Sequence, residues 1–172
     1  MTATKAELLS KLRTSGDQIV SKLRALPPDS FEQGRYESGW NGRQILAHIA
    51  SIEWTYPRLI AVARGDLPKP EPAGTDQRST EQAYRPSMAA GINDYNQRQV
   101  DKLAEASIAE LLALFEKNRA ATIAAVQAAD DALFEKGVRS AGGLQGSLGQ
   151  VLEMVAVAHV GGHVNDIVSA AP

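Results

Sequence analysis

Residues 147–170 have the sequence SLGQVLEMVAVAHVGGHVNDIVSA, and this stretch carries the signals that decide the fold. Ser147, followed three residues later by Gln150, has the pattern of a capping box, in which each residue's side chain binds the other's backbone N–H. Apolar and small residues then recur at helical spacing together with two histidines and an aspartate, as Leu152, Ala156, His159, His163, Asp166 and Ala170. The stretch predicts an amphipathic helix whose inward stripe includes both histidines.

Three earlier stretches begin in the same way, with the capping pairs Thr4 and Glu7, Asn41 and Gln44, and Ser107 and Glu110. The stripes that follow them are Leu8, Leu12, Ile19, Leu23 and Leu26; Ile45, Ile49, Ile52, Tyr56, Leu59 and Ala63; and Leu111, Phe115, Thr122, Val126 and Ala129. Pro57 lies inside the second stripe, where it should kink the helix or remove one hydrogen bond from it. Four such helices predict an all-α, four-helix bundle, a fold that builds its sites from facing helices.

The segments between these helices predict one long crossover connection. Leu67–Ala90 is first rich in proline and then polar, which favours a long crossover or a partial lid. Ile92–Glu105 is expected to be helical from about Asn93 or Asp94. Gly137–Gly149 contains five glycines and is expected to be a flexible connection, without convincing β-alternation. The length of 172 residues fits a single domain over residues 1–172.

Composition excludes several classes of function. Eighteen basic residues against twenty acidic ones give a net charge of −2, which argues against nucleic acid as a partner. The absence of cysteine excludes disulfides, cysteine nucleophiles and thiolate metal sites. No apolar run approaches the roughly 18 residues that span a bilayer, and the charged N-terminus lacks a secretory signal. We therefore expect a cytoplasmic protein that does not bind membranes.

The three histidines, His48, His159 and His163, are the most informative residues for function. His159 and His163 are four residues apart, so their Cβ atoms should lie about 6 Å apart on one helix face, a spacing used to bind zinc. His48 falls on the inward stripe of the second helix, so neighbouring helices would bring three imidazoles together inside the bundle. Three imidazoles plus a water form a catalytic divalent metal site. The alternative is that each histidine is a core residue that donates to a backbone carbonyl.

Five further residues are weaker candidates, each with a structural alternative. Asp166 shares the face of the histidine pair, where it could be a metal ligand, an acceptor that orients an imidazole, or a general base. The alternative is a surface carboxylate. Gln44 lies one turn before His48 and could donate to a substrate, or be occupied in its capping box. Asn96 could reach the open end of the bundle, or cap a helix. Glu53 is expected to be a solvated charge, and Trp40 a hydrophobic staple more than a substrate platform.

The adjacent glycines Gly161 and Gly162 lie between the paired histidines. Each costs helix stability of about 1 kcal/mol relative to alanine. Their lack of side chains would permit close helix approach, either within the bundle or across a dimer face.

Three stretches together resemble the DinB/YfiT-like superfamily of metal-binding four-helix bundles: WNGRQILAHIA at 40–50, Asp94-Tyr95-Asn96, and HVGGHVNDI at 159–167. The resemblance implies a homodimer that binds zinc, nickel or another divalent ion through His48, His159 and His163. It also implies thiol transfer with low-molecular-weight thiols such as bacillithiol, mycothiol or glutathione, or hydrolase-type reactions. The sequence ends at Pro172, before the extra domain of mycothiol-dependent maleylpyruvate isomerases, which weakens that specific expectation.

We expect a metal-dependent enzyme in which a thiol or water, activated in the open metal position, attacks an electrophilic small molecule. Thiol S-transfer in detoxification or stress response is the leading version, and metal-assisted hydrolysis is the second. The substrate would enter at the bundle end near the Leu67–Ala90 connection. The rival hypothesis is a non-catalytic, dimeric bundle that binds a metal or small ligand, with the histidines as structural core.

Overall fold

The computed structural model of the chain describes residues 4–33, 39–67 and 81–170, with the side chains of 81–91 excepted. Its elements are α1 (Lys5–Arg24), the 3-10 helix η1 (Pro28–Glu32), α2 (Gly42–Ile52), α3 (Thr55–Arg64), α4 (Glu81–Lys102), α5 (Ile108–Ala128), the 3-10 helix η2 (Asp131–Glu135), β1 (Gly137–Arg139), β2 (Gln145–Ser147), α6 (Leu148–Leu152), the π-helix η3 (Glu153–His159) and α7 (Val160–Ala170).

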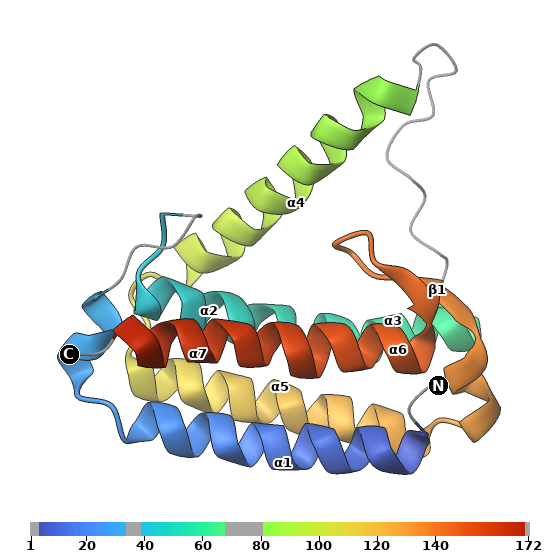
Figure 1. Cartoon of the computed structure of the whole chain (residues 1–172), viewed down its shortest axis with the longest axis horizontal. Coiled ribbons are helices and arrows are strands. Elements are labelled where there is room, and N and C mark those ends of the chain that lie inside the picture. The colour runs from blue at the N-terminus through green and yellow to red at the C-terminus, as the bar shows by residue number, and fades with distance from the viewer. Residues whose placement is uncertain (1–3, 34–38, 68–80, 171–172) are drawn as a thin grey trace.

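Four helical rods lie side by side and form the predicted all-α bundle (Figure 1). The rods are α1, α2 with α3, α5, and α6 with η3 and α7. Helix α5 packs against α1, α2 and α3, while α7 packs against α1 and α2. Helix α4 contacts α2 and then projects obliquely away from the bundle (Figure 1). In the part of the chain that the structure describes, no helix has the length and apolarity needed to cross a membrane.

All four predicted capping boxes form, and they fix where the rods begin. At Thr4, Asn41, Ser107 and Ser147, the N-cap side chain accepts from the backbone N–H three residues later, and the return bond is also present. Each box satisfies two N–H groups that the first turn of a helix leaves without partners.

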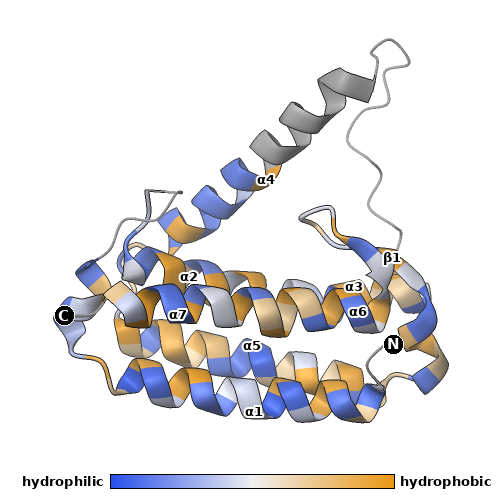
Figure 2. Ribbon diagram, in the orientation of Figure 1, coloured by the Kyte–Doolittle hydropathy of each residue, from blue (hydrophilic) through white to orange (hydrophobic). Residues whose placement is uncertain are grey.

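The predicted apolar stripes supply the core. The α1 positions Leu8, Leu12, Ile19 and Leu23 are buried, and so are all five predicted positions of the third helix. Figure 2 shows hydrophobic and hydrophilic residues alternating around the bundle rods, as amphipathic helices require.

The second rod is broken near Pro57, as its sequence predicted. Helix α2 ends at Ile52 and α3 begins at Thr55, which places Pro57 in the first turn of α3. A proline is tolerated there because the first N–H groups of a helix have no partner within the helix. The break leaves a short turn at Glu53 and Trp54, between the two helices.

Two expectations for the connecting segments were wrong. Part of Gly137–Gly149 forms a two-stranded antiparallel hairpin, with Gly137 opposite Ser147 and Arg139 opposite Gln145. Strands of three residues are too short to show alternation in the sequence. Helix α4 begins at Glu81 and not near residue 93, in a stretch with no apolar periodicity to predict it. The predicted crossover falls partly on residues 68–80, outside the described residues.

Glu53 is not the solvated charge that its distance from His48 suggested; the structure buries it completely beside Arg119. Position 53 is four residues after Ile49 and three before Tyr56, so it lies on the same buried face as both. Arg119 likewise lies on the α5 stripe, four residues after Phe115. The pair could have been predicted from the sequence, because Glu53 and Arg119 carry opposite charges and each lies on the apolar stripe of its helix.

Arg119 contacts groups from three other segments through all three nitrogens of its guanidinium. Its Nε lies 2.6 Å from Glu53 Oε1, and its Nη2 donates to Glu53 Oε2 at 3.0 Å and to the Ala156 carbonyl at 2.7 Å. Its Nη1 donates to the Leu12 carbonyl at 3.3 Å and to Ser15 Oγ at 3.2 Å. Burial raises the pKa of Glu53 to about 7, and Arg119 opposes that rise.

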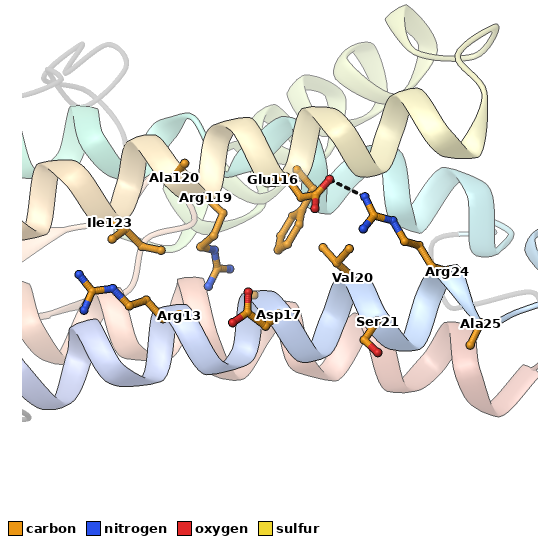
Figure 3. A pocket seen from close by; sticks show the side chains of 12 residues that line it. Arg13, Asp17, Val20, Ser21, Arg24, Ala25, Glu116, Arg119, Ala120 and Ile123 are labelled. Carbon is orange, nitrogen blue, oxygen red and sulfur yellow. Dashed lines mark hydrogen bonds and ion pairs between the residues drawn. The ribbon is translucent and has the colours of Figure 1, made fainter.

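Arg119 also lines a groove between α1 and α5, toward which its side chain extends (Figure 3). A Cβ atom at Gly16 would lie 3.3 Å from Arg119 Cγ, so the glycine makes room for the arginine stem. The exposed pair Arg24 and Glu116 bridges the two helices at the same groove. Arg119 Nη1 and Nη2 already donate within the bundle. Its Nε is held beside the Glu53 carboxylate as an ion pair but makes no hydrogen bond.

Replacing one member of the buried pair should destabilise the fold strongly. We expect Arg119→Met to lower the free energy of unfolding by about 3–5 kcal/mol, because it leaves Glu53 buried without a partner. The double variant Glu53→Met/Arg119→Met should recover much of this loss. The control Arg24→Met, in the exposed pair, should cost less than about 1 kcal/mol. Urea denaturation measures all three, and equal effects of the two single variants would contradict the assignment.

Candidate metal centre

The last rod contains a π-helix, η3, that shifts its buried stripe by one residue. The predicted stripe continued from Leu152 and Ala156 to His159, His163 and Asp166. The observed buried positions after Leu152 and Ala156 are instead Val160, Val164 and Ile167. A π-helix closes its turns with i→i+5 bonds in place of i→i+4, which adds about one residue to a turn. The prediction that both histidines point into the core was therefore wrong.

Two side chains from neighbouring helices bind the carbonyls of this π segment. Tyr56 on α3 donates its hydroxyl to the Val155 carbonyl at 2.8 Å, and Arg119 on α5 donates to the Ala156 carbonyl. Burial raises the pKa of Tyr56, so the phenol stays a neutral donor. A π turn disturbs the regular helical ladder, and these donors satisfy two of its carbonyls.

The shift brings the paired histidines to the edge of the rod, where they meet His48 from α2. The ring centroids of His48 lie 6.0 Å from His159 and 5.2 Å from His163, and the pair itself is 4.4 Å apart. One ring nitrogen from each histidine lies within 4.8 Å of the other two. Three imidazoles from two separate rods thus converge at one point, although that point is at the bundle edge and not in its centre.

Exposure increases across the three residues. His48 is only 4% exposed, the His163 side chain is 22% exposed, and His159 is an exposed residue. The indole of Trp40 lies beside the buried imidazole, with ring centroids 5.2 Å apart. The cluster of three imidazoles is consequently closed on the His48 side and open to solvent on the His159 side.

Burial keeps these imidazoles neutral. It lowers the pKa of His48 to about 3, with smaller contributions from His163 and His159. It also lowers the pKa of His163 to about 4, an effect that His159 reinforces and Asp166 opposes, and it lowers the pKa of His159. Neutral imidazole is the form that binds metal ions.

The donor set fits a divalent metal ion. His48 Nδ1 is buried and has no hydrogen-bond partner, and a buried polar atom left in that state is costly. Bonds of about 2.0–2.1 Å to one tetrahedral ion place ligand nitrogens about 3.4 Å apart, so movements of roughly 1 Å by each side chain would close the set, whose nitrogens lie within 4.8 Å of one another. Three imidazoles would leave the remaining coordination positions for an exchangeable ligand.

The structure gives the surroundings of the three weaker candidates, Asp166, Gln44 and Asn96. The Asp166 carboxylate is 3.9 Å from His163 Nδ1 and is half-exposed. Gln44 has its amide oxygen occupied, because it accepts from the Asn41 N–H in the capping box. Asn96 is half-buried on α4, and the next residue, Gln97, accepts from the Trp40 indole N–H at 2.8 Å. Roles for these three in binding or catalysis stay predictions.

The glycine pair does not serve close packing within the bundle. A Cβ atom built at Gly161 or Gly162 meets no atom within 4 Å, apart from the helix's own backbone. Of the two expectations for these residues, close approach inside the bundle is therefore wrong for the described part of the chain.

Comparisons with known proteins agree with the fold. The sequence profile of the DinB superfamily matches residues 11–167. A search of curated protein sequences found no significant match. Among solved structures, the chain is similar to a histidine-to-alanine mutant of the mycothiol-dependent maleylpyruvate isomerase, with a TM-score of 0.68 and 17% sequence identity. The match covers 96% of this chain and 61% of the isomerase chain, so this chain spans less than two thirds of that protein.

The lowered pKa values predict how stability depends on pH in the metal-free protein. His48 and His163 bind protons less readily in the folded state than in the unfolded state, so their contribution to stability should fall as pH falls below about 6.5, while the raised pKa of Glu53 acts in the opposite sense. Each group adds a slope of up to about 1.4 kcal/mol per pH unit. Urea denaturation of chelator-treated protein at pH 7, 6 and 5 measures the effect. His48→Gln should lose less stability than wild type over this range, and parallel losses would contradict the prediction.

Proposed function

Since the profile match over residues 11–167 shows that the chain belongs to the DinB superfamily, we propose that it is a metal-dependent enzyme acting on a small molecule. His48, His159 and His163 would hold one divalent ion. The convergence of these three side chains, with His48 Nδ1 buried and unpartnered, is the observation that carries the proposal. A structural core role would require each imidazole to find its own hydrogen-bond partner.

Zinc and nickel are the metals that we propose, because both bind well to imidazole nitrogen. A divalent ion bound here would lower the pKa of a thiol or water in its open position. The chain's own contribution is to keep three imidazoles neutral, to close the site on the Trp40 side and to leave it open beside His159. That arrangement admits a nucleophile from solvent while holding the ligands in place.

We propose thiol S-transfer as the reaction, with a low-molecular-weight thiol as co-substrate. The thiol sulfur would form a bond to an electrophilic carbon of the substrate, and the leaving group would depart with the bonding electron pair. The thiol proton would pass to solvent or to a base at the open side. Two things support this choice: membership of the family, and the similarity of the fold to an isomerase that is itself mycothiol-dependent. A role in detoxification or stress response fits such a reaction.

Asp166 is the residue that we propose for handling that proton or for orienting His163. Its carboxylate faces His163 Nδ1 across 3.9 Å and is half-exposed, so it can reach both the imidazole and solvent. Gln44 and Asn96 are proposed to contact the substrate: Gln44 through its amide N–H, since its oxygen is used by the capping box, and Asn96 from α4. The resemblance to the family also favours a homodimer in the cytoplasm.

Metal analysis tests the foundation of this proposal. Protein purified without a histidine tag and reconstituted with Zn²⁺ or Ni²⁺ should bind about one equivalent. His163→Ala should weaken binding at least about 100-fold, because even changes to groups behind a ligand cost 10- to 100-fold. Asn165→Ala, an exposed change on the same helix, serves as the control. Less than about 0.2 equivalents in wild type, with no effect of His163→Ala on occupancy or thermal stability, would remove the basis for an enzyme.

The Co²⁺-substituted protein tests the choice of reaction. Addition of glutathione, mycothiol or bacillithiol should shift its visible absorption spectrum if a thiol sulfur enters the open position. The same thiol should then be consumed together with an electrophilic substrate, with one conjugate formed for each thiol. Metal binding without any spectral shift would contradict S-transfer and favour metal-assisted hydrolysis.

A further inference from the structure

Gly162 lies on the flank of α7 that carries the exposed imidazole. It is three residues after His159 and four before Asp166, and residues at these spacings are neighbours on a helix surface. Gly161 is two residues from both His159 and His163, so it faces away from them. The two glycines are adjacent in the chain, but only Gly162 borders the candidate metal centre.

The fold does not require a glycine at this position. Backbone φ is positive at Gly39, Gly65 and Gly143, and not at Gly162. No described atom lies within 4 Å of a Cβ built there, so close packing does not explain it. Glycine inside a helix is unfavourable relative to alanine by about 1 kcal/mol. The packing of the described residues therefore gives no reason for a glycine at this position.

A side chain at residue 162 would cover the exposed end of the three-imidazole group. Helical side chains point back toward the N-terminus and lie over the preceding turn. A side chain at residue 162 would thus lie over Ala158 and His159. The opposite end is already closed, because His48 is buried and packs beside Trp40. His159 is the exposed member of the three, so its side of the cluster is open to an approaching ligand.

We propose that Gly162 determines the size of ligand that the metal centre accepts. The absence of a side chain there would leave the approach past His159 uncrowded for a donor atom attached to a bulky group, such as the cysteine sulfur of a tripeptide thiol. A larger residue at 162 would still admit a small anion. This inference rests on the proposed function, because it requires a metal ion at the three histidines.

Two leucine variants test the inference with Co²⁺-loaded protein, azide as the small probe and glutathione as the bulky one. In Gly162→Leu, the affinities for Co²⁺ and azide should stay within about threefold of wild type. The affinity for glutathione, read from the visible spectrum, should fall at least about tenfold. Gly161→Leu is the matched control and should leave all three affinities within about threefold. Both variants should unfold at a similar or higher urea concentration than wild type, since both remove a helical glycine.

The possible results separate this inference from the function on which it rests. If wild type takes up no Co²⁺, the proposed function is wrong and the inference is wrong with it. If wild type binds Co²⁺ and azide but not glutathione, the metal centre stands while the inference fails. Equal glutathione affinity in the two leucine variants would also overturn it. If wild type is a dimer on analytical ultracentrifugation and either leucine variant is not, the glycines belong to a subunit interface and the inference is also overturned.

Discussion

The buried guanidinium of Arg119 contacts three segments outside its own helix. The acceptors are the Glu53 carboxylate at the end of α2, two groups on α1, and the Ala156 carbonyl in the π-helix η3. A buried guanidinium is tolerated only when its charge is paired and its donors are satisfied. The relative placement of all four rods is therefore constrained at this one residue. Since Glu53 follows His48 by five residues and Ala156 precedes His159 by three, the same contacts also connect the two rods that carry the histidines.

The π-helix η3 connects the contacts of Arg119 with the position of the histidine pair. In a regular α-helix, Val160 and Val164 would lie progressively farther around the helix from Leu152, and one additional residue in the π turn brings them into line with it. Burial of these side chains stabilises the shifted arrangement by hydrophobic transfer. The carbonyls that the π turn disturbs bind Tyr56 and Arg119. As a result the histidine pair leaves the core stripe and reaches solvent, without separating from His48.

The resulting site is asymmetric, and its asymmetry suits a centre that binds an exchangeable ligand. The buried His48 has a ring nitrogen with no partner, while His159 at the other end is exposed. Three histidines wholly inside the core would have been cut off from any substrate. Three histidines wholly at the surface would have kept ordinary pKa values and competed with solvent for their ligand. The edge position combines neutral imidazoles with access, and Gly162 keeps that access unobstructed.

Local sequence patterns determined the number of rods, the residues at which they begin and the spacing of His159 and His163, because capping boxes and i, i+4 neighbours are formed by residues close in the chain. The convergence of His48 with that pair could also be predicted, since four amphipathic helices have few ways to bury their stripes. The side of the last rod that faces inward could not be predicted. After Ala156, an inward stripe can continue through His159 or through Val160. Which of the two faces the core depends on the burial of apolar side chains and on the hydrogen bonds that Tyr56 and Arg119 donate from other rods. The burial of Glu53 was decided in the same way, because its partner lies 66 residues away and only the packed bundle brings the two charges together.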